Sequence, residues 1–259
     1  MSDCATRQPG KQAMQLPERV LIIMPAYNEA ENLQRVLAEL AEVLPQADVV
    51  VIDDASQDET AVVAHRCGAT VVSLPCNLGY GGAVQTGYRY AIAKGYAYAV
   101  MLDADGQHDP RSVPDLLAPV VAGEADVAVG SRFLGKLEYD VGWARRLGMR
   151  LFGRIVASVT GWTVTETTSG YQALNRRVLA YFSRDNYPSD YPDADTLLMM
   201  HFAGFCVVEV PVTMRGRIAG ESMHASWKTI YYTLKMLLSI YMVCLRGRGR
   251  RQQAGADHA

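Results

Sequence analysis

Short apolar runs without polar alternation recur along the first half of the chain. Such runs, rich in β-branched residues, are typical of strands that are covered on both faces. They are "RVLIIMP" (19–25), "ADVVVIDD" (47–54), "ATVVSLP" (69–75), "AYAVMLDAD" (97–105) and "ADVAVGSR" (125–132).

Between these runs, apolar residues follow a helical spacing. The clearest case is 29–44, where five apolar residues fall on one helical face: Leu33, Val36, Leu37, Leu40 and Leu44. Helices are also expected over 58–67, 82–94 and 111–122. Alternation of strands and helices predicts an α/β fold with a mostly parallel central sheet flanked by helices.

The second half of the chain is less regular. Helices are expected over 142–161 and 193–203, an extended segment over 169–176 and a strand over 205–214. Pro211 favours a position for this strand at the edge of the sheet. Because no repeat or low-complexity linker separates the halves, we expect one domain with a terminal appendage.

Composition narrows the function classes. The chain has 259 residues, 49% of them apolar and 20% charged, with a formal net charge of −2. A nucleic-acid-binding protein normally carries a basic surface, so no nucleic-acid partner is expected. Residues 1–19 contain no apolar leader segment, and 1–18 are expected to form a disordered arm. The five cysteines form no CxxC pair, which argues against a disulfide framework or zinc site and favours a cytoplasmic location.

Polar segments follow four of the predicted strands. They are "PAYNE" (25–29), "DDAS" (53–56), "PCNLGYGG" (75–82) and "DADGQHD" (103–109). In an open parallel sheet, ligands bind beyond the carboxyl ends of the strands. The four segments are therefore expected to form one mostly acidic site for a ligand that brings cations or many hydroxyl groups.

Asp103 and Asp105 are candidates for a metal site. Two residues apart in extended backbone, their side chains point the same way, and paired carboxylates bind hard divalent ions such as Mg²⁺. The alternative is a solvated acidic turn without a metal. A calcium loop is excluded, because its sixth position requires glycine and its twelfth glutamate, where this chain has His108 and Pro114.

The residues around this pair have simpler interpretations. Asp109 precedes Pro110 and is expected to cap the following helix. His108 is interpreted as a structural, hydrogen-bonding residue, with a site-lining role as the alternative. For "GYGG" (79–82), a flexible strand-to-helix turn and a close approach to a ligand are both open.

The end of the chain predicts an amphipathic helix over 224–246 and a basic flexible tail over 247–259. Within 228–246, four polar residues fall in one narrow stripe of an otherwise apolar surface: Lys228, Lys235, Ser239 and Arg246. The segment is short for a membrane span and has Lys235 midway. We expect it to lie in the membrane interface, with the arginine-rich tail near anionic headgroups. A core or dimer helix is the alternative.

Taken in order and at their separations, "PAYNE", "DDAS", "NLGYGGA" and "DADGQHDP" resemble the family 2 inverting glycosyltransferases. "VGSRF" (129–133), "TSGYQALNR" (168–176) and "EVPVTMRGRIAGESM" (209–223) extend the likeness, which spans about residues 20–245. It is greatest for the branch that contains dolichyl-phosphate mannose synthase and bacterial polyprenyl-phosphate glycosyltransferases.

The resemblance implies a GT-A glycosyltransferase domain over 19–223, with a nucleotide-binding half (19–132) and an acceptor half (133–223). The implied reaction moves a hexose from a UDP- or GDP-sugar to polyprenyl phosphate, with Mg²⁺ or Mn²⁺ as cofactor. The enzyme would be peripherally attached to the cytoplasmic face of the membrane. Its oligomeric state is left open.

The resemblance also implies roles for individual residues. On the nucleoside side these are Pro25, Tyr27, Glu29, Asp53 and Asp54, with Asp54 toward the base or ribose. Asp103, Ala104 and Asp105 match the motif for the metal and the diphosphate, and Gln107 lies beside it. The residues matching phosphate-side and acceptor-side positions are Arg132, Ser169, Gly170, Asp193, Asp195, Arg217, Gly220 and Ser222.

Two positions depart from the family pattern. Relatives usually carry Asp at the position of Glu166 and Arg at that of Gln172, so a fixed positive charge is missing on the acceptor side. This departure keeps open a saccharide or other hydroxyl acceptor, for which Asp195 would act as base. The acids at 193 and 195 have the alternative of merely starting a helix. A non-catalytic nucleotide-binding subunit and a sugar nucleotidyltransferase are further alternatives.

Overall fold

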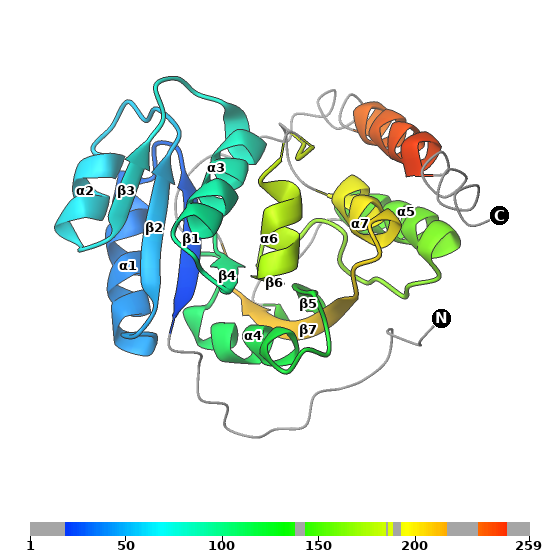
Figure 1. Ribbon diagram of the computed structural model, residues 1–259, viewed down its shortest axis with the longest axis horizontal. Helices are drawn as coiled ribbons and strands as arrows, with labels where there is room; N and C mark the ends of the chain where they lie inside the picture. The colour runs from blue at the N-terminus through cyan, green and yellow to red at the C-terminus, as the bar shows by residue number, and fades with distance from the viewer. Residues whose placement is uncertain (1–18, 138–142, 185, 189–192, 217–232, 248–259) are drawn as a thin grey trace.

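The computed structural model of the protein describes residues 19–137, 143–184, 186–188, 193–216 and 233–247. A seven-stranded sheet runs through them in the order β3-β2-β1-β4-β6-β5-β7, with helices on both faces (Figure 1). Its strands are β1 (Val20–Ala26), β2 (Asp48–Asp53), β3 (Thr70–Ser73), β4 (Tyr98–Met101), β5 (Val127–Leu137), β6 (Gln172–Asn175) and β7 (Val207–Met214).

The strand directions confirm the mostly parallel sheet. β1 pairs in parallel with β2 and β4, β2 with β3, and β5 with β7. Only β6 is reversed within this sheet, being antiparallel to both of its neighbours, β4 and β5. The carboxyl ends of the other six strands and the amino end of β6 therefore lie along one edge. β7, which contains Pro211, is an edge strand as predicted.

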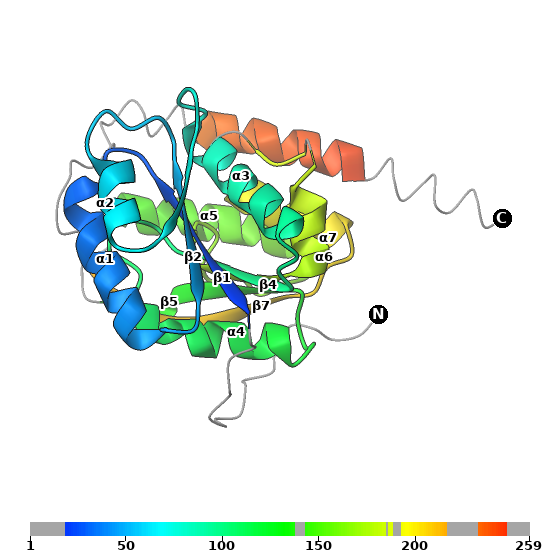
Figure 2. The same ribbon diagram turned by 60° about the vertical axis from the view of Figure 1, so that its left-hand side comes forward.

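The helices form a layer on each face of the sheet. α3 (Gly79–Ala93), α5 (Trp143–Thr160), α6 (Arg176–Phe182) and α7 (Ala194–Phe202) share a core cluster with one face. α1 (Ala30–Val43), α2 (Thr60–Arg66) and α4 (Val113–Val121) contribute to the cluster on the other face. Figure 2 shows α4 below the sheet, and α3 and the terminal helix above it.

β1 explains why the strands show no polar alternation. Leu21 and Ile23 belong to one core cluster, whereas Val20, Ile22 and Met24 belong to the other. Because both faces are covered by helices, every position of the strand is buried. The predicted apolar face of α1 is confirmed by five buried residues: Leu33, Val36, Leu37, Leu40 and Leu44.

The second half of the chain holds the main differences from the predicted elements. α6 was not predicted; Asn175 begins it by accepting a 3.2 Å hydrogen bond from the N–H of Val178. β5 continues to Leu137, with a register irregularity between Ser131 and Lys136. The strand is longer than predicted because it continues to pair with β7 beyond that irregularity.

The terminal helix is described over residues 233–247, while the start of the predicted segment lies outside the described residues. None of the helices in the described part of the chain is long and apolar enough to cross a membrane. The predicted polar stripe is only partly correct. Lys235 and Arg246 are exposed, but Ser239 faces α7, where its hydroxyl binds Asp195.

Three of the described cysteines, Cys67, Cys76 and Cys244, are free thiols. Cys206 is disulfide-bonded. A single bond is not the disulfide framework against which the cysteine spacing argues.

Candidate active site

The end of β2 holds two of the predicted nucleoside-side acids, Asp53 and Asp54, both buried. Asp53 Oδ1 accepts a 3.0 Å hydrogen bond from the N–H of Ser56. Asp54 accepts from the N–H groups of Leu78 at 2.7 Å and Gly79 at 3.0 Å. These two bonds tie the loop after β2 to the amino end of α3, where the helix dipole favours a negative charge.

The loop after β1 carries the other nucleoside-side residues. Pro25 is buried within β1, whereas the ring of Tyr27 is 44% exposed at the strand edge. Glu29 Oε2 accepts a 2.7 Å hydrogen bond from the side-chain amide of Asn32. Its backbone N–H donates to Thr60 Oγ1 at 2.9 Å, so the loops after β1 and β2 are joined.

Asp103 and Asp105 follow β4 at the same edge of the sheet. Tyr80 Oη donates a 2.7 Å hydrogen bond to Asp103 Oδ1, and the N–H of Gln107 donates a 3.0 Å bond to Asp105 Oδ1. Ala104 between them is buried. Within the described residues, no group of three or more His, Cys, Asp or Glu side chains is arranged to hold a metal ion. A cation here would therefore need oxygen ligands from water or a bound substrate, as Mg²⁺ commonly has.

Tyr80 is a site residue that the sequence reasoning missed. Burial and the neighbouring Asp103 raise the pKa of its hydroxyl well above the usual value, so it stays a hydrogen-bond donor. Gly170 lies against this pair, because a Cβ added there would be 2.6 Å from Tyr80 Oη and 3.3 Å from Asp103 Oδ2. The signal available in the sequence was the position of Tyr80 within "NLGYGGA".

His108 supports the acidic pair from the other side. Its Nδ1 accepts a 3.1 Å hydrogen bond from the N–H of Asp103, and its ring stacks on Tyr171 at 4.6 Å between centroids. Burial lowers the pKa of His108 to about 4, so the imidazole is neutral near pH 7. This agrees with a structural, hydrogen-bonding role. Asp109 caps the next helical turn as predicted, accepting from the N–H of Arg111 at 3.0 Å.

Arg132, which lies within β5, forms a buried ion pair with Glu166. Arg132 Nε donates to Glu166 Oε2 at 2.5 Å, and the side chains are 6% and 0% exposed. Glu166 Oε1 also accepts from the Thr168 hydroxyl at 2.8 Å. Glu166, one of the two departures, thus orients the arginine predicted to lie near the phosphates.

Gln172, the other departure, serves the turn that precedes it. Its side-chain amide donates a 2.9 Å hydrogen bond to the carbonyl oxygen of Ser169. Gln172 and Ser169 are both buried. The neutral amide therefore lies where the family resemblance leads us to expect a positive charge, and it stabilises the turn that brings Gly170 to Asp103.

Asp193 and Asp195 lie at the start of α7, and both are buried. Asp193 occupies the cap position without a side-chain capping bond. Asp195 Oδ1 accepts from the N–H of Thr196 at 2.9 Å, and Oδ2 accepts from the hydroxyl of Ser239 at 2.6 Å. The hydrogen bond from Ser239 to Asp195 is not needed to start α7.

Through-space electrostatics connect these groups. Burial has the largest effect on the pKa of His108. The charges of Asp105 and Glu166 raise this pKa, and the charge of Arg132 lowers it. Burial and Tyr88 raise the pKa of Tyr187 well above its usual value, with smaller contributions from Tyr80 and Asp195. The residues grouped in this way come from both halves of the chain: Tyr80, Asp103, Asp105, His108, Arg132, Glu166, Tyr187 and Asp195.

Arg217, Gly220 and Ser222 lie outside the described residues. Arg215 lies near the end of the described residues that precede them, and its guanidinium donates to both carboxylate oxygens of Glu39 at 2.7 Å. Arg215 also lies 3.0 Å from Asp109 Oδ1, and its N–H donates to the carbonyl oxygen of Gln107 at 2.8 Å. The chain directly after β7 is therefore fixed to the loop that carries the acidic pair.

A largely apolar groove of about 550 Å³ lies between α5 and residues 163–165. Its lining residues are Phe133, Met149, Arg150, Gly153, Arg154, Ala157, Thr163, Val164 and Thr165. Phe133 and Thr165 are the chain neighbours of Arg132 and Glu166, so the groove begins beside the buried ion pair. It combines an apolar wall with two arginines of α5.

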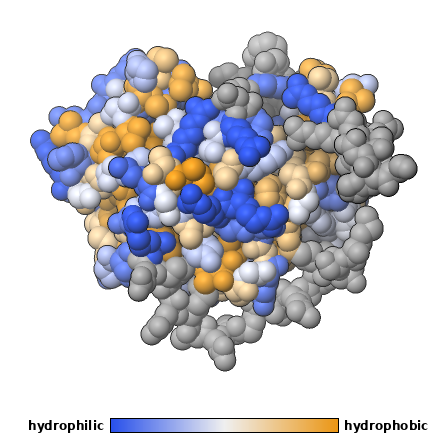
Figure 3. Space-filling view, viewed as in Figure 1, coloured by the Kyte–Doolittle hydropathy of each residue, from blue (hydrophilic) through white to orange (hydrophobic). Residues whose placement is uncertain are grey.

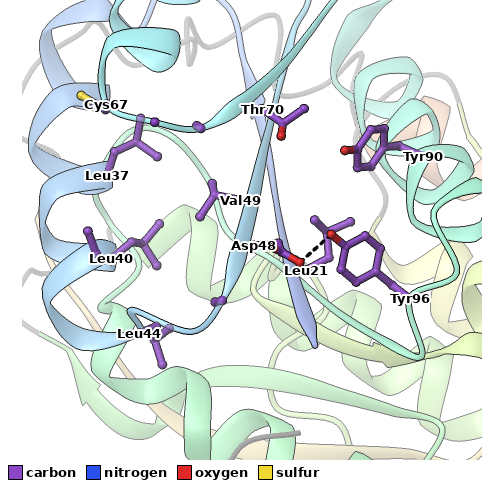
Figure 4. Close-up of a pocket in the computed structure, with 14 residues that line it drawn as sticks. Leu21, Leu37, Leu40, Leu44, Asp48, Val49, Cys67, Thr70, Tyr90 and Tyr96 are labelled. Atoms are coloured by element: carbon purple, nitrogen blue, oxygen red, sulfur yellow. Dashed lines mark hydrogen bonds between the residues drawn. The ribbon is translucent and has the colours of Figure 1, made fainter. Parts of the chain in front are cut away.

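A second, smaller cavity of about 220 Å³ lies at the opposite, amino-terminal edge of the strands. Figure 4 shows leucines of α1 on one side and Tyr90 and Tyr96 on the other. Tyr96 Oη donates a 2.7 Å hydrogen bond to Asp48 Oδ2 across it. Because none of the predicted site residues lines this cavity, we assign it no part in the site.

Comparison with known proteins shows the family to which the chain belongs. The family model described as "Glycosyl transferase family 2" matches residues 21–182. Undecaprenyl-phosphate mannosyltransferase of Micrococcus luteus is 35% identical, with 79% of this chain and 86% of that protein covered. Polyprenol monophosphomannose synthase of Mycolicibacterium smegmatis is 32% identical, with 79% of this chain and 80% of that protein covered.

A solved structure shows the same fold. Glucosyl-3-phosphoglycerate synthase of Mycobacterium tuberculosis, in complex with Mn²⁺, UDP-glucose and phosphoglyceric acid, superposes with a TM-score of 0.70. It is 21% identical, and the match covers 93% of this chain and 86% of that chain. The strand-edge site, the matched family model and the two relatives together identify the chain as a member of glycosyl transferase family 2, with a GT-A fold.

Proposed function

We propose that this glycosyltransferase moves a hexose from a UDP- or GDP-sugar to polyprenyl phosphate, with inversion at the anomeric carbon. The observation that carries the proposal is the Asp103–Asp105 pair at the shared strand edge, where Tyr80 and His108 hold Asp103 from two sides. The names of the two relatives, a polyprenol monophosphomannose synthase and an undecaprenyl-phosphate mannosyltransferase, support polyprenyl phosphate as the acceptor class.

A divalent cation fits the chemistry of this pair. Carboxylate oxygens are the ligands that Mg²⁺ and Mn²⁺ prefer, and two carboxylates leave coordination positions for a diphosphate and water. When bound, the cation would offset the negative charge that develops on the departing nucleoside diphosphate. We assign Asp103 and Asp105 as its ligands.

The remaining residues bind and orient the two substrates. Tyr27 and the acids after β2 would contact the nucleoside. Arg132 supplies a fixed positive charge, and its bond to Glu166 holds it in one orientation. Because a phosphate acceptor is already ionised near pH 7, it needs no base, and Asp195 would orient it.

The groove beside Arg132 suits an acceptor with a phosphate head and an apolar tail. Met149, Ala157 and Val164 offer apolar surface, and Arg150 and Arg154 carry the opposite charge to a phosphate. A saccharide would use such a lining poorly, since it needs hydrogen-bonding groups along its length.

The terminal helix supports attachment to a membrane surface. Six large apolar side chains are exposed on it: Leu234, Leu237, Leu238, Tyr241, Met242 and Leu245. Figure 3 shows hydrophobic atoms over this helix at the upper right, beside a hydrophilic patch. Exposed Lys235 and Arg246 lie along one side of the apolar residues, as in helices that lie in a membrane interface. A cytoplasmic, peripheral location follows from this proposal.

A hydroxyl acceptor is the second candidate function. It is favoured by Gln172, a neutral residue whose amide bonds Ser169, at a position where the family resemblance leads us to expect an arginine. Asp195 would then take the proton from the attacking hydroxyl. A non-catalytic role is disfavoured, because the chain keeps both acids of the candidate metal site.

One assay separates these functions. Purified protein is incubated with labelled UDP- and GDP-hexoses and polyprenyl phosphate in detergent, with and without EDTA, and label is counted in the lipid extract. We expect lipid-extractable label that EDTA abolishes and that the Asp105→Asn variant lowers at least a hundredfold. Transfer that is unaffected by EDTA and by Asp105→Asn contradicts the metal assignment. In a parallel reaction that supplies a saccharide, label that enters the saccharide and not the lipid extract favours the hydroxyl acceptor.

A further inference from the structure

The terminal helix reaches the acceptor side of the site through one side chain. Ser239 Oγ donates a 2.6 Å hydrogen bond to Asp195 Oδ2, although 44 positions separate the two residues in the chain. The contact is sheltered, because Asp195 is 4% exposed. A buried carboxylate depends on such donors, since an unpaired charged group inside a protein is costly.

The two oxygens of Asp195 have different partners. Oδ1 is held within α7 itself by the N–H groups of Thr196 and Asp193, at 2.9 and 3.3 Å. Oδ2 accepts from a hydroxyl on another helix. The rotation of the carboxylate about its bond to Cβ therefore depends on where the terminal helix sits.

The same helix has two apolar faces with different surroundings. Met236 and Ile240 are buried in the core cluster that includes Ala194 and Leu197 of α7. On the other side Leu238 is 62% exposed, with the five further apolar side chains named above. Figures 1 and 2 both show the helix along the side of the molecule that holds α7. One face thus binds the catalytic domain while the other is open to a lipid surface.

We propose that Ser239 is a positioning residue for Asp195. We also propose that contact of the terminal helix with a lipid surface holds the Asp195 carboxylate, through this bond, in the orientation in which it faces the acceptor. The inference rests on the proposed function. Burial of the outer face in the interface restricts the helix, and the restricted helix keeps the Ser239 hydroxyl within reach of Asp195. The acceptor site is then completed where a lipid-borne phosphate is present.

The first test is kinetic and uses a short-chain, water-soluble prenyl phosphate as acceptor. Ser239→Ala should lower kcat about tenfold or raise the acceptor KM by a similar factor, leaving the donor KM unchanged. Ser239→Thr, which keeps the hydroxyl, should recover most of the loss. Ser158→Ala is the matched control, because Ser158 is an exposed helix serine that bonds only its own α5 backbone in the described contacts.

A double-variant cycle separates positioning from general destabilisation. If Ser239 acts through Asp195, adding Ser239→Ala to Asp195→Asn should cause no further loss. The positioning role is overturned if the activity losses of the two single variants multiply in the double variant. It is also overturned if Ser239→Ala changes the donor KM as much as the acceptor KM.

Lipid coupling is tested without turnover. Anionic phospholipid vesicles should slow amide hydrogen exchange in residues 194–202 several-fold in the wild-type protein, and much less in Ser239→Ala and in Leu238→Glu. Unchanged exchange in the wild-type protein with bound vesicles overturns the inference. Absence of transfer to any prenyl phosphate by the wild-type protein rejects instead the proposed function, and the exchange experiment still decides the coupling.

Discussion

The hydroxyl of Tyr80 donates a 2.7 Å hydrogen bond to Asp103 Oδ1, which links the first turn of α3 to the first acid of the candidate metal site. The tyrosine is half-buried, and its raised pKa keeps the proton on its oxygen. The rotation of Asp103 is thus fixed before any ligand arrives, and preorganisation of this kind lowers the cost of binding a cation.

Removal of this hydroxyl should weaken metal binding without unfolding the protein. In Tyr80→Phe the carboxylate of Asp103 loses a charge-assisted donor, worth about 1.5–3 kcal/mol. We expect the apparent Mn²⁺ affinity to fall about tenfold or more, measured by titrating activity with metal. Tyr90→Phe, on the same helix but at the opposite cavity, should behave as wild type; equal metal affinities of all three proteins would rule out the positioning of Asp103 by Tyr80.

Gly170 should tolerate no side chain while Tyr80 is present. A Cβ at this position lies 2.6 Å from Tyr80 Oη, closer than packed atoms allow, so Gly170→Ala should lower activity and melting temperature. Because Tyr80→Phe removes the clashing oxygen, the double variant Gly170→Ala/Tyr80→Phe should be more stable than Gly170→Ala alone. Thermal unfolding of the four proteins checks this, and strictly additive changes would contradict the contact.

The buried pair of Arg132 and Glu166 should be costly to break. Glu166→Gln removes the carboxylate charge that the guanidinium of Arg132 contacts, and loss of one partner of such a pair destabilises proteins by about 3–5 kcal/mol. Urea unfolding measures the free-energy change, with Glu209→Gln as a comparison because Glu209 bonds the same loop through backbone N–H groups. A change below 1 kcal/mol in Glu166→Gln would show that the pair is dispensable.

Asp195 should distinguish the two acceptor classes. Asp195→Asn removes the capacity to accept a proton but keeps the side-chain shape, so transfer to a hydroxyl acceptor should be nearly abolished. A phosphate acceptor, already ionised near pH 7, should retain part of its rate. Steady-state rates of the wild-type protein and Asp195→Asn are compared with both acceptors. Equal losses of rate with the two acceptors would contradict a role for Asp195 as base toward the hydroxyl acceptor alone.

The fold was largely predictable from the sequence because its strands are covered on both faces. Residues such as Ile22 and Ile23, adjacent in β1, are both buried in different core clusters, and this leaves an apolar run that few other structures produce. α6 escaped prediction because it is short, and its start at Asn175 is a local capping signal next to an apolar strand.

The site was only partly predictable. Asp103 and Asp105 could be predicted because two carboxylates at this spacing indicate a metal site by themselves. Tyr80, Gly170 and Ser239 were not given roles with them, since the bonds to Asp103 and Asp195 join residues that are distant in the chain. A pattern of apolar and polar positions reports which side of a helix is buried, and it does not report what a buried hydroxyl contacts. For that reason the sequence pattern places Ser239 in the polar stripe.

The central claim is that Asp103 and Asp105 hold a divalent cation together with the nucleoside diphosphate. Electron paramagnetic resonance of Mn²⁺ measures it most directly, with protein, UDP or GDP, and the variants Asp103→Asn and Asp105→Asn. We predict that the wild-type protein with the nucleotide removes the free Mn²⁺ signal at concentrations where nucleotide alone does not, and that either variant restores it. Identical free Mn²⁺ for the wild-type protein and both variants would contradict the claim.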